Sequence, residues 1–398
     1  MTAYLDHAAT TPMLPVARAA VLEQMERVGN PSSLHTSGRA ARSVVEESRE
    51  RIAGALGAQP SEVIFTSGGT EADNLAVTGL WRARHGAPDG AARTRIVTSG
   101  VEHHAVLDVV EHLVTHEGAQ ATFVEPSDCG RIAVADLSAA LTDAGGPESV
   151  ALASVMWANN EVGTIQDIPA MAATAREHGV PFHTDAVQAA GHVPVDFASS
   201  GADLMTVTAH KLGGPVGVGA LLVRRDVVLE PLTFGGGQER RIRSGTLDAP
   251  LVAGFAAALD EAVSTMVTES ARVAGLRDDL IRGALALDLG ITVTGCWEPG
   301  DVTSRLPGNV HLLVPGTQGD SLLYLLDAAG VEVSTGSACQ AGVPRPSHVV
   351  LALGYTPEQA AGSLRITLGH TSTRADVEAL LAALPPAVER ARRAAGVA

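Results

Sequence analysis

Short runs of apolar residues alternate with longer amphipathic stretches through the first 250 residues of the chain. The apolar runs lie at residues 63–66, 95–98, 150–156, 180–183, 204–207 and 217–224. Short apolar runs bounded by turn residues are typical of buried strands, and the stretches between them have helical periodicity. The alternation predicts an α/β fold in which helices cover a largely parallel sheet.

The pattern changes near residue 251. Beyond it, long alanine-rich helical stretches dominate, with shorter strand candidates at residues 309–314 and 330–334. A change of this kind predicts a domain boundary. We assign a large α/β domain to residues 14–255 and a smaller α+β domain to residues 1–13 and 256–398.

The composition of the 398-residue chain narrows its functional class. Its hydrophobic content of 45% can build a large core, while its net charge of −16 argues against direct nucleic-acid or anionic-membrane contact. Such surfaces carry clustered basic residues. The amino-terminal residues show no basic segment followed by an apolar one, and no apolar run is long enough to span a bilayer. We therefore expect a cytoplasmic protein with no membrane contact.

The cysteines give little indication of covalent or metal cross-links. Cys129, Cys296 and Cys339 are far apart in the sequence and lack C-x-x-C spacing. This spacing predicts neither a disulfide framework nor a zinc site, and it leaves room for a single reactive thiol.

One side chain stands out by its chemistry. Of 28 Lys and Arg residues, Lys211 is the only lysine. Arginine supplies positive charge as well as lysine does, but its guanidinium stays protonated and cannot form a Schiff base. A general bias toward arginine explains the lone lysine equally well, so its neighbours must decide between the two interpretations.

Polar side chains follow the predicted strands at their carboxyl ends, where ligands bind in open α/β sheets. Asp185 and Gln188 follow the fourth apolar run, and Thr208, His210 and Lys211 follow the fifth. Asp185 either caps the next turn or holds a pyridinium nitrogen protonated, as a pyridoxal ring requires. The convergence of a carboxylate, a hydroxyl, an imidazole and an amine favours a pyridoxal phosphate site.

Two further segments are expected at the same edge. Gly69 and Thr70 lie in a strand-to-helix turn that suits either a phosphate or an ordinary capping box. His103 follows the second apolar run, where it can stack on an aromatic cofactor or move protons. Its neighbour His104 is expected to be an exposed residue at a helix start.

The motifs taken together resemble the cysteine desulfurases of the NifS/IscS type, in the class V branch of the fold-type I pyridoxal phosphate enzymes. The resemblance runs nearly from end to end. It is carried by residues 4–12, 30–35, 66–74, 102–103, 159–163, 183–188, 209–211, 235–246, 334–339 and 363–365. It implies a mainly parallel seven-stranded sheet in the large domain, and a small domain that carries the catalytic cysteine loop.

The resemblance also implies the roles of individual residues toward pyridoxal 5'-phosphate. Lys211 forms the covalent link, Asp185 pairs with the ring nitrogen, Gln188 bonds the ring hydroxyl, and His103 stacks on the ring. The phosphate is bound by Gly69, Thr70, Thr208, His210 and, from the neighbouring protomer of a homodimer, Thr246. A glycine-rich surface turn is the alternative for Thr246.

The implied reaction takes sulfur from L-cysteine. Asn160 and Arg365 hold the substrate carboxylate, Lys211 removes the α-proton, and His103 moves further protons. The Cys339 thiolate takes the sulfur, which leaves a persulfide and L-alanine. The acceptor is an iron-sulfur scaffold or a tRNA-thiolating enzyme.

Other functions remain open at this point. A selenocysteine lyase or a class V aminotransferase shares the cofactor residues, and a sulfur-relay or scaffold protein would bind partners without turnover. The chain departs from the family pattern at Thr208, where serine is common, and at Gln340, where a small hydroxyl residue is frequent. Cys129 and Cys296 match no family motif and are expected to be incidental thiols.

Overall fold

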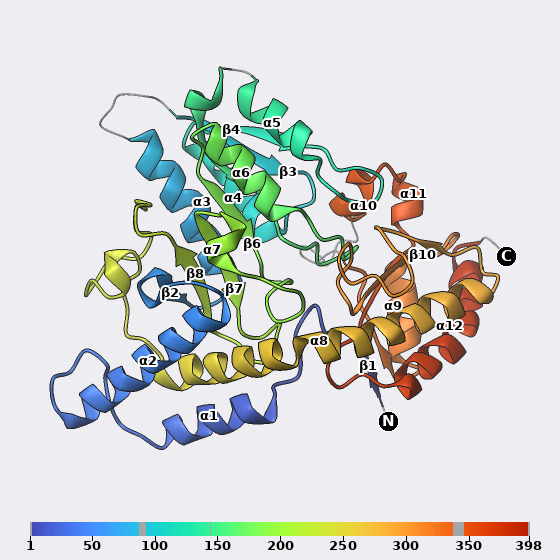
Figure 1. Cartoon of the computed structure of the whole chain (residues 1–398). Coiled ribbons are helices and arrows are strands. Elements are labelled where there is room, and N and C mark those ends of the chain that lie inside the picture. Colours follow the sequence, from blue (N-terminus) through green and yellow to red (C-terminus); the bar gives the residue numbers. More distant parts are fainter. Residues whose placement is uncertain (1, 87–92, 144, 337–345, 397–398) are drawn as a thin grey trace.

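The structure, a computed structural model, describes residues 2–86, 93–143, 145–336 and 346–396. Figure 1 shows a large α/β part and a smaller part, with one long helix running between them. Cys339 and Gln340 lie outside the described residues.

A seven-stranded sheet forms the centre of the large part. Its strands are β2 Val63–Thr66, β3 Arg95–Ser99, β4 Gln120–Val124, β5 Val150–Ser154, β6 Phe182–Asp185, β7 Leu204–Thr208 and β8 Gly219–Val223. They lie in the order β2-β8-β7-β6-β5-β3-β4. Strand β8 is antiparallel to both neighbours, and the other pairs are parallel. The predicted α/β fold with a mainly parallel seven-stranded sheet is confirmed.

Both faces of the sheet are covered, which explains why the strands read as continuous apolar runs. In β8, Ala220 and Leu222 belong to the core on one face, and Leu221 and Val223 belong to the core on the other. Helices α5 Val134–Thr142 and α6 Ile168–Glu177 contribute to the first core, and α3 Gly69–His85 and α4 His104–His116 contribute to the second. The apolar pattern does not predict β4, because this edge strand exposes Gln120 and Phe123.

Helix α8, Ala249–Ala286, is 38 residues long and connects the two cores. Phe255 and Leu259 lie in the large core, whereas Leu280 and Ile281 lie in the small one. The helix therefore runs through the predicted boundary at residue 255 (Figure 1). Among the described helices, only α8 is long and apolar enough to cross a membrane, and packing in two cores accounts for its apolar residues.

The smaller part combines two small sheets with helices. An antiparallel sheet in the order β12-β10-β9 consists of β9 Thr292–Val293, β10 Asn309–Leu313 and β12 Ser363–Thr367. The amino-terminal strand β1, Ala3–Tyr4, pairs in parallel with β11, Val331–Glu332. Strand β12 is not among the predicted strands.

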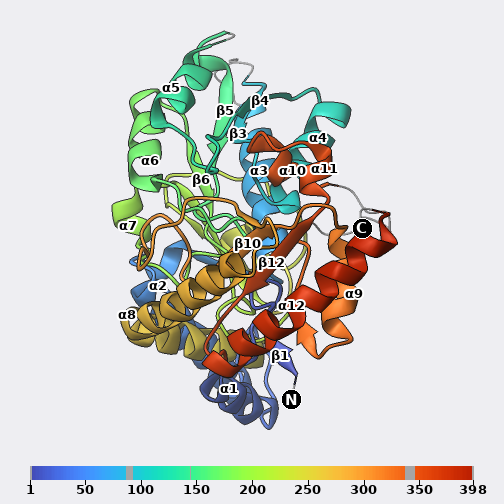
Figure 2. The same cartoon turned by 90° about the vertical axis from the view of Figure 1, so that its right-hand side faces the viewer.

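The small-domain helices surround these strands. In Figure 2, α8, α9 Gly319–Asp327 and α12 Arg374–Ala394 gather around β10 and β12. Helix α10, His348–Ala352, lies against the large part, where Val349 packs with Val101. The remaining helices are α1 Pro15–Met25, α2 Thr36–Ala55, α7 Phe197–Ser200 and α11 Pro357–Ala360.

One expectation about the cysteines is wrong. Cys129 and Cys296 form a disulfide, with their Cα atoms 4.9 Å apart, although 167 positions separate them in the sequence. They are therefore not incidental thiols. Sequence spacing missed the pair because packing of loops from the two parts of the molecule, rather than local sequence, brings the two side chains together.

Candidate active site

A cavity of about 440 Å³ opens where the carboxyl ends of the large-sheet strands face the small domain. Ten of the twelve predicted site residues line it: Gly69, Thr70, His103, Asn160, Asp185, Gln188, Thr208, His210, Lys211 and Arg365. The carboxyl ends of parallel strands meet at one sheet edge, so residues distant in sequence converge there. Thr246 is exposed just before α8 and does not line this cavity, and Cys339 lies outside the described residues.

Lys211 follows β7 and points into the cavity. Its Nζ donates hydrogen bonds to the carbonyl oxygens of Ala8 at 2.6 Å and Ala9 at 2.9 Å. Burial, followed by the positive charge of Arg365, lowers the pKa of Lys211 to about 8. A substantial fraction of this amine is therefore neutral near pH 8, as a nucleophile or a base must be.

Asp185 is the last residue of β6 and faces the same cavity. Its Oδ1 accepts a hydrogen bond from the backbone N–H of Val187 at 2.8 Å. Burial raises the pKa of Asp185 to about 6, while that hydrogen bond and Lys211 act in the opposite direction. A cationic ring nitrogen in the cavity would lower this pKa again, because an opposite charge favours the carboxylate.

A second buried aspartate, Asp73, lines the same cavity as Asp185, and sequence reasoning missed it. Asp73, on α3, has an Oδ1 atom 3.6 Å from Nε2 of His183. Burial and then the charge of Asp185 raise the pKa of Asp73 well above its usual range. Of the two neighbouring carboxyl groups, Asp73 is therefore disfavoured as the charged one, and Asp185 is favoured. Its position one turn after Thr70, on the helix face toward the sheet, was the available signal.

His183 supports this arrangement without reaching the substrate space. Its Nδ1 lies 2.9 Å from Ser154 Oγ, and its Nε2 lies 3.0 Å from Thr206 Oγ1. Burial lowers the pKa of His183 to about 3, so the ring is neutral at physiological pH. Strands β5 and β7 thus hold the imidazole from both sides.

His103 caps α4 and presents its ring to the cavity. Its Nδ1 accepts the N–H of Ala105 at 3.1 Å, so in the neutral ring the proton lies on Nε2. The protein packed around the ring, followed by Lys211, lowers the pKa of His103 to about 4. Its neighbour His104 starts the helix, is half-exposed and contacts Asp108.

The start of α3 forms a cradle of the kind that binds a phosphate. A Cβ added to Gly69 would lie 2.9 Å from a methyl group of Val187, so a side chain would close this space. The first turn of a helix offers free N–H groups and a positive dipole end. Thr208 and His210 also line the cavity, and burial and Lys211 lower the pKa of His210 to about 4.

Arg365, from β12, bounds the cavity on the small-domain side. Its Nη2 pairs with Asp6 Oδ1 at 2.8 Å, and its Nη1 donates to the carbonyl of Asn160 at 3.2 Å. Its Nε is buried and has no hydrogen-bond partner among the described residues. Arg365 is thus buried at the edge of the cavity and already pairs with one carboxylate, that of Asp6.

The turn at residues 159–163 places Asn160 opposite Arg365. The Asn159 side chain accepts the N–H groups of Glu161 and Val162, each at 2.9 Å, which fixes the turn. Glu161 is buried in the cavity wall, and its Oε2 accepts a hydrogen bond from Ser347 Oγ at 2.5 Å. Sequence reasoning did not identify Glu161 as a site residue.

This set of groups fits pyridoxal phosphate. A lysine with a lowered pKa, a buried aspartate, a neutral histidine and the open start of a helix line one cavity. Each of the three parts of the cofactor, the aldehyde, the ring nitrogen and the phosphate, has a matching group.

Comparisons with known proteins find a matching family and close relatives over nearly the whole chain. The family model for class-V aminotransferases matches residues 3–380. The chain is 55% identical to an IscS-like cysteine desulfurase from Mycobacterium tuberculosis, over 99% of this chain and 98% of that protein.

Solved structures of similar proteins share the fold. A NifS-like protein from Rickettsia africae aligns with a TM-score of 0.85 at 28% identity, covering 98% of this chain and all of that one. SspA in complex with cysteine aligns with a TM-score of 0.78 at 29% identity, covering 94% of this chain and all of that one.

Proposed function

This chain belongs to the class-V aminotransferase family and is a cysteine desulfurase that uses pyridoxal phosphate, and we propose that it transfers the sulfur of L-cysteine through Cys339 to an acceptor protein. One observation supports the proposal most directly. A single cavity has groups for an amine at one end and a group for a carboxylate at the other, as an amino acid bound through its amine requires. Lys211 and Asp185 face the amine end, and Arg365 faces the carboxylate end.

Pyridoxal phosphate supplies an electron sink for the electron pair left on the substrate when its α-proton leaves. Lys211 would hold its aldehyde carbon, Asp185 its ring nitrogen and Gln188 its ring hydroxyl, and His103 would stack on the ring. Its phosphate would be held by Gly69, Thr70, Thr208, His210 and Thr246 of a neighbouring protomer.

The protein's own groups then bind the substrate and move protons. Arg365, which lines the cavity, would bind the substrate carboxylate, with Asn160 beside it. The neutral amine of Lys211 takes the α-proton, which its lowered pKa permits near neutral pH. The Nε2–H of His103 can donate a hydrogen bond into the cavity, because Nδ1 accepts the N–H of Ala105.

The sulfur step is balanced without an added oxidant or reductant. The Cys339 thiolate attacks the substrate sulfur, the bond between that sulfur and the β-carbon breaks, and an S–S bond forms on Cys339. The carbon skeleton takes up protons and leaves as L-alanine. Overall, L-cysteine and one enzyme thiol become L-alanine and one enzyme persulfide.

We also propose a homodimer. Exposed apolar side chains lie on α1 and in the loop after it, namely Leu22, Met25, Val28 and Leu34. Contiguous exposed apolar residues mark protein contact surfaces. The exposure of Thr246 outside its own cavity is compatible with a role in a neighbouring protomer.

The acceptor and the compartment complete the proposal. The persulfide passes to an iron-sulfur scaffold or a tRNA-thiolating enzyme, and we place the reaction in the cytoplasm. A cysteine that must return to the free thiol after each transfer suits a reducing compartment.

Intact mass spectrometry tests the function. After brief exposure of the holoenzyme to L-cysteine, one added sulfur of about 32 Da should appear, be removed by reductant and map to Cys339. L-alanine should form without any keto acid. The variant Cys339→Ser should bind the cofactor and substrate but release no sulfur, since serine is a far poorer nucleophile. Sulfide and alanine at the wild-type rate from that variant would refute the role of Cys339.

A further inference from the structure

The disulfide between Cys129 and Cys296 joins the two parts of the molecule. Cys129 lies in the loop after β4 of the large sheet, and Cys296 lies in the loop after β9 of the small one. Both residues are only half-buried, so a small oxidant or reductant can reach them. The mechanism described above uses neither thiol.

The disulfide lies next to the segment that follows Asn160 in the chain. Thr164 Oγ1 donates a hydrogen bond to the carbonyl of Cys129 at 2.6 Å, and Gln166 Nε2 donates to the carbonyl of Gly130 at 2.8 Å. On the other side, Ile165 N donates to the carbonyl of Ser304 at 3.0 Å. Loops from both domains therefore form hydrogen bonds with residues 164–166, directly after the turn at 159–163.

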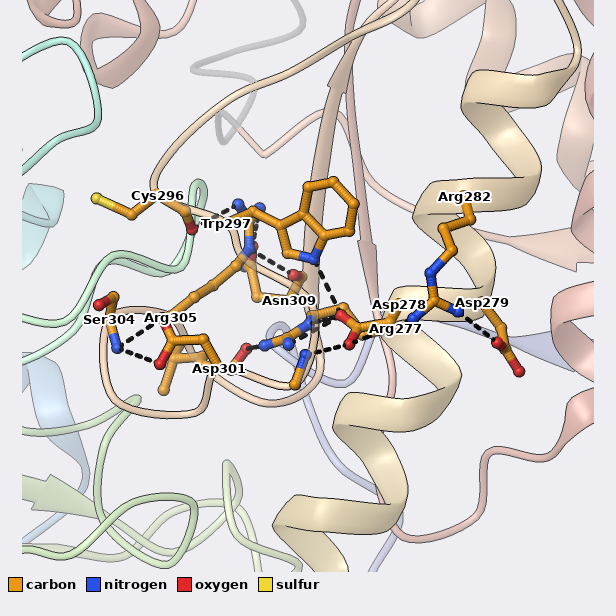
Figure 3. A network of polar contacts seen from close by, with 12 residues as sticks. Arg277, Asp278, Asp279, Arg282, Cys296, Trp297, Asp301, Ser304, Arg305 and Asn309 are labelled. Atoms are coloured by element: carbon orange, nitrogen blue, oxygen red, sulfur yellow. Dashed lines mark hydrogen bonds and ion pairs between the residues drawn. The ribbon is translucent and has the colours of Figure 1, made fainter.

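The Cys296 loop is tied to the core of the small domain. Figure 3 shows the Cys296 side chain pointing away from a network of buried polar groups that holds its backbone. The fully buried Arg305 donates to the carbonyls of Thr294 at 2.8 Å and Cys296 at 3.2 Å. On α8, Asp278 accepts the indole N–H of Trp297 at 2.9 Å. A bond at the Cys296 sulfur therefore connects Cys129 to the small domain itself.

The same network reaches the cavity wall. Arg305 Nη2 contacts Asn309 Oδ1 at 3.3 Å, and Asn309 Nδ2 donates to the carbonyl of Glu161 at 3.0 Å. Asn160, next to Glu161, contacts Arg365 of the small domain through its carbonyl. The carboxylate end of the cavity is thus built from residues of both domains, which are the two domains that the disulfide joins.

We infer that Cys129 and Cys296 form a reversible redox site whose disulfide restrains the domain junction and weakens binding of the amino-acid carboxylate. Oxidation by a peroxide balances: two thiols and one hydrogen peroxide give the disulfide and two waters. A dithiol reductant reverses the reaction. In a reducing compartment, a half-exposed pair of cysteines is reduced until an oxidant appears. The disulfide then acts as a redox sensor rather than as a permanent structural cross-link.

The restraint has a physical basis in domain movement. Enzymes that bind a ligand between two domains commonly close around it by small rotations. A covalent link between two loops at the junction opposes such a movement, because the loops can no longer separate or slide. We therefore expect the reduced form to bind substrate more tightly than the oxidised form.

Thiol trapping tests the redox site itself. The Cys339→Ser holoenzyme, which leaves two cysteines, is equilibrated with mixtures of reduced and oxidised glutathione and trapped with N-ethylmaleimide under denaturing conditions. We expect two maleimide adducts at the reducing end, and none, with a Cys129–Cys296 cross-linked peptide, at the oxidising end. Two adducts in every mixture, or glutathione on each cysteine without a cross-link, would overturn the inference.

Ligand binding tests the coupling. L-alanine is the probe, since it carries the same carboxylate and has no thiol that could reduce the disulfide. Its Kd is followed by the absorbance of the bound cofactor in the oxidised and reduced Cys339→Ser holoenzyme. We expect the oxidised form to bind L-alanine about fivefold more weakly, within the usual range for coupled sites.

A matched variant separates the disulfide from other oxidation. In Cys129→Ser/Cys339→Ser, the same treatment should leave the Kd for L-alanine unchanged. Equal Kd values in the two forms of Cys339→Ser, despite a complete cross-link, would show that the disulfide does not affect the site. Neither measurement requires turnover, so failure of this inference is distinct from failure of the proposed sulfur transfer.

Discussion

At the strand-edge end of the cavity, the half-buried Lys211 and the buried Asp185 are contacted by neutral backbone groups, whereas at the end between the domains Arg365 is paired with the carboxylate of Asp6. Burial consequently moves the pKa values of Lys211 and Asp185 toward neutrality. Arg365 already pairs with a carboxylate, that of Asp6. The comparison teaches that the first end is built to exchange protons and the second to bind an anion.

The largest expected effect tests the proton-exchanging end. Lys211→Arg keeps the positive charge but removes the amine that can lose its proton. We expect alanine formation to fall by about a thousandfold or more, as for loss of an acid-base group that also links the cofactor. Borohydride reduction and peptide mapping of the wild type should place the cofactor on Lys211. A label found only at the amino terminus would contradict the assignment.

Asp185→Asn removes the charge at the same end while keeping the shape. An amide cannot hold the ring nitrogen protonated, so we expect turnover to fall by about a hundredfold with the fold intact. Steady-state alanine production and circular dichroism measure the two properties. Asp203→Asn is the control, since Asp203 is also partly buried and caps a strand N–H of Phe182 away from the cavity. Equal turnover in wild type and Asp185→Asn would make Asp185 a structural cap.

Arg365→Lys tests the anion-binding end. A point charge cannot replace the planar fork, so we expect the KM for cysteine to rise by about tenfold to a hundredfold, equivalent to ~1.5–3 kcal/mol. The kcat should change less, because proton transfer occurs at the other end. Arg374→Lys serves as control, since Arg374 forms an exposed pair with Asp279. A KM unchanged in Arg365→Lys would remove Arg365 from substrate binding.

The smallest expected effect tests whether burial sets the pKa of a carboxyl group near the strand edge. Glu102 accepts hydrogen bonds from Ser99 Oγ and Met156 N, and burial raises its pKa to about 8. The folded state thus keeps a proton that the unfolded state loses above pH 4.5. Stability from this site is full below that pH and is lost as the pH rises through about 8.

Glu102→Gln imitates the protonated form at every pH. We expect its Tm to rise relative to wild type between pH 5 and pH 8.5, with a free-energy gain of roughly 1–3 kcal/mol. The exposed Glu26→Gln should show no such trend. A Tm difference that is flat with pH would mean that Glu102 is ionised in the folded protein.

Several features were predictable because they follow from local pattern and strand direction. The apolar runs predict six strands of the large sheet and the edge at which their polar residues meet. Strand β12 is missed because its five residues include Ser363 and Arg365, which interrupt the apolar pattern although all are buried. The edge strand β4 is missed for the opposite reason, since its exposure removes the need for apolar residues.

By itself, the sequence determined the sheet, its ligand-binding edge and the residues gathered there, because strand burial and direction are encoded over a few neighbouring positions. Only the tertiary structure decided how groups far apart in sequence meet. It brought Asp73 and Asp185 into one cavity, paired Asp6 with Arg365, and joined Cys129 to Cys296. These contacts depend on how the domains and the amino-terminal segment pack, and no local pattern records that packing.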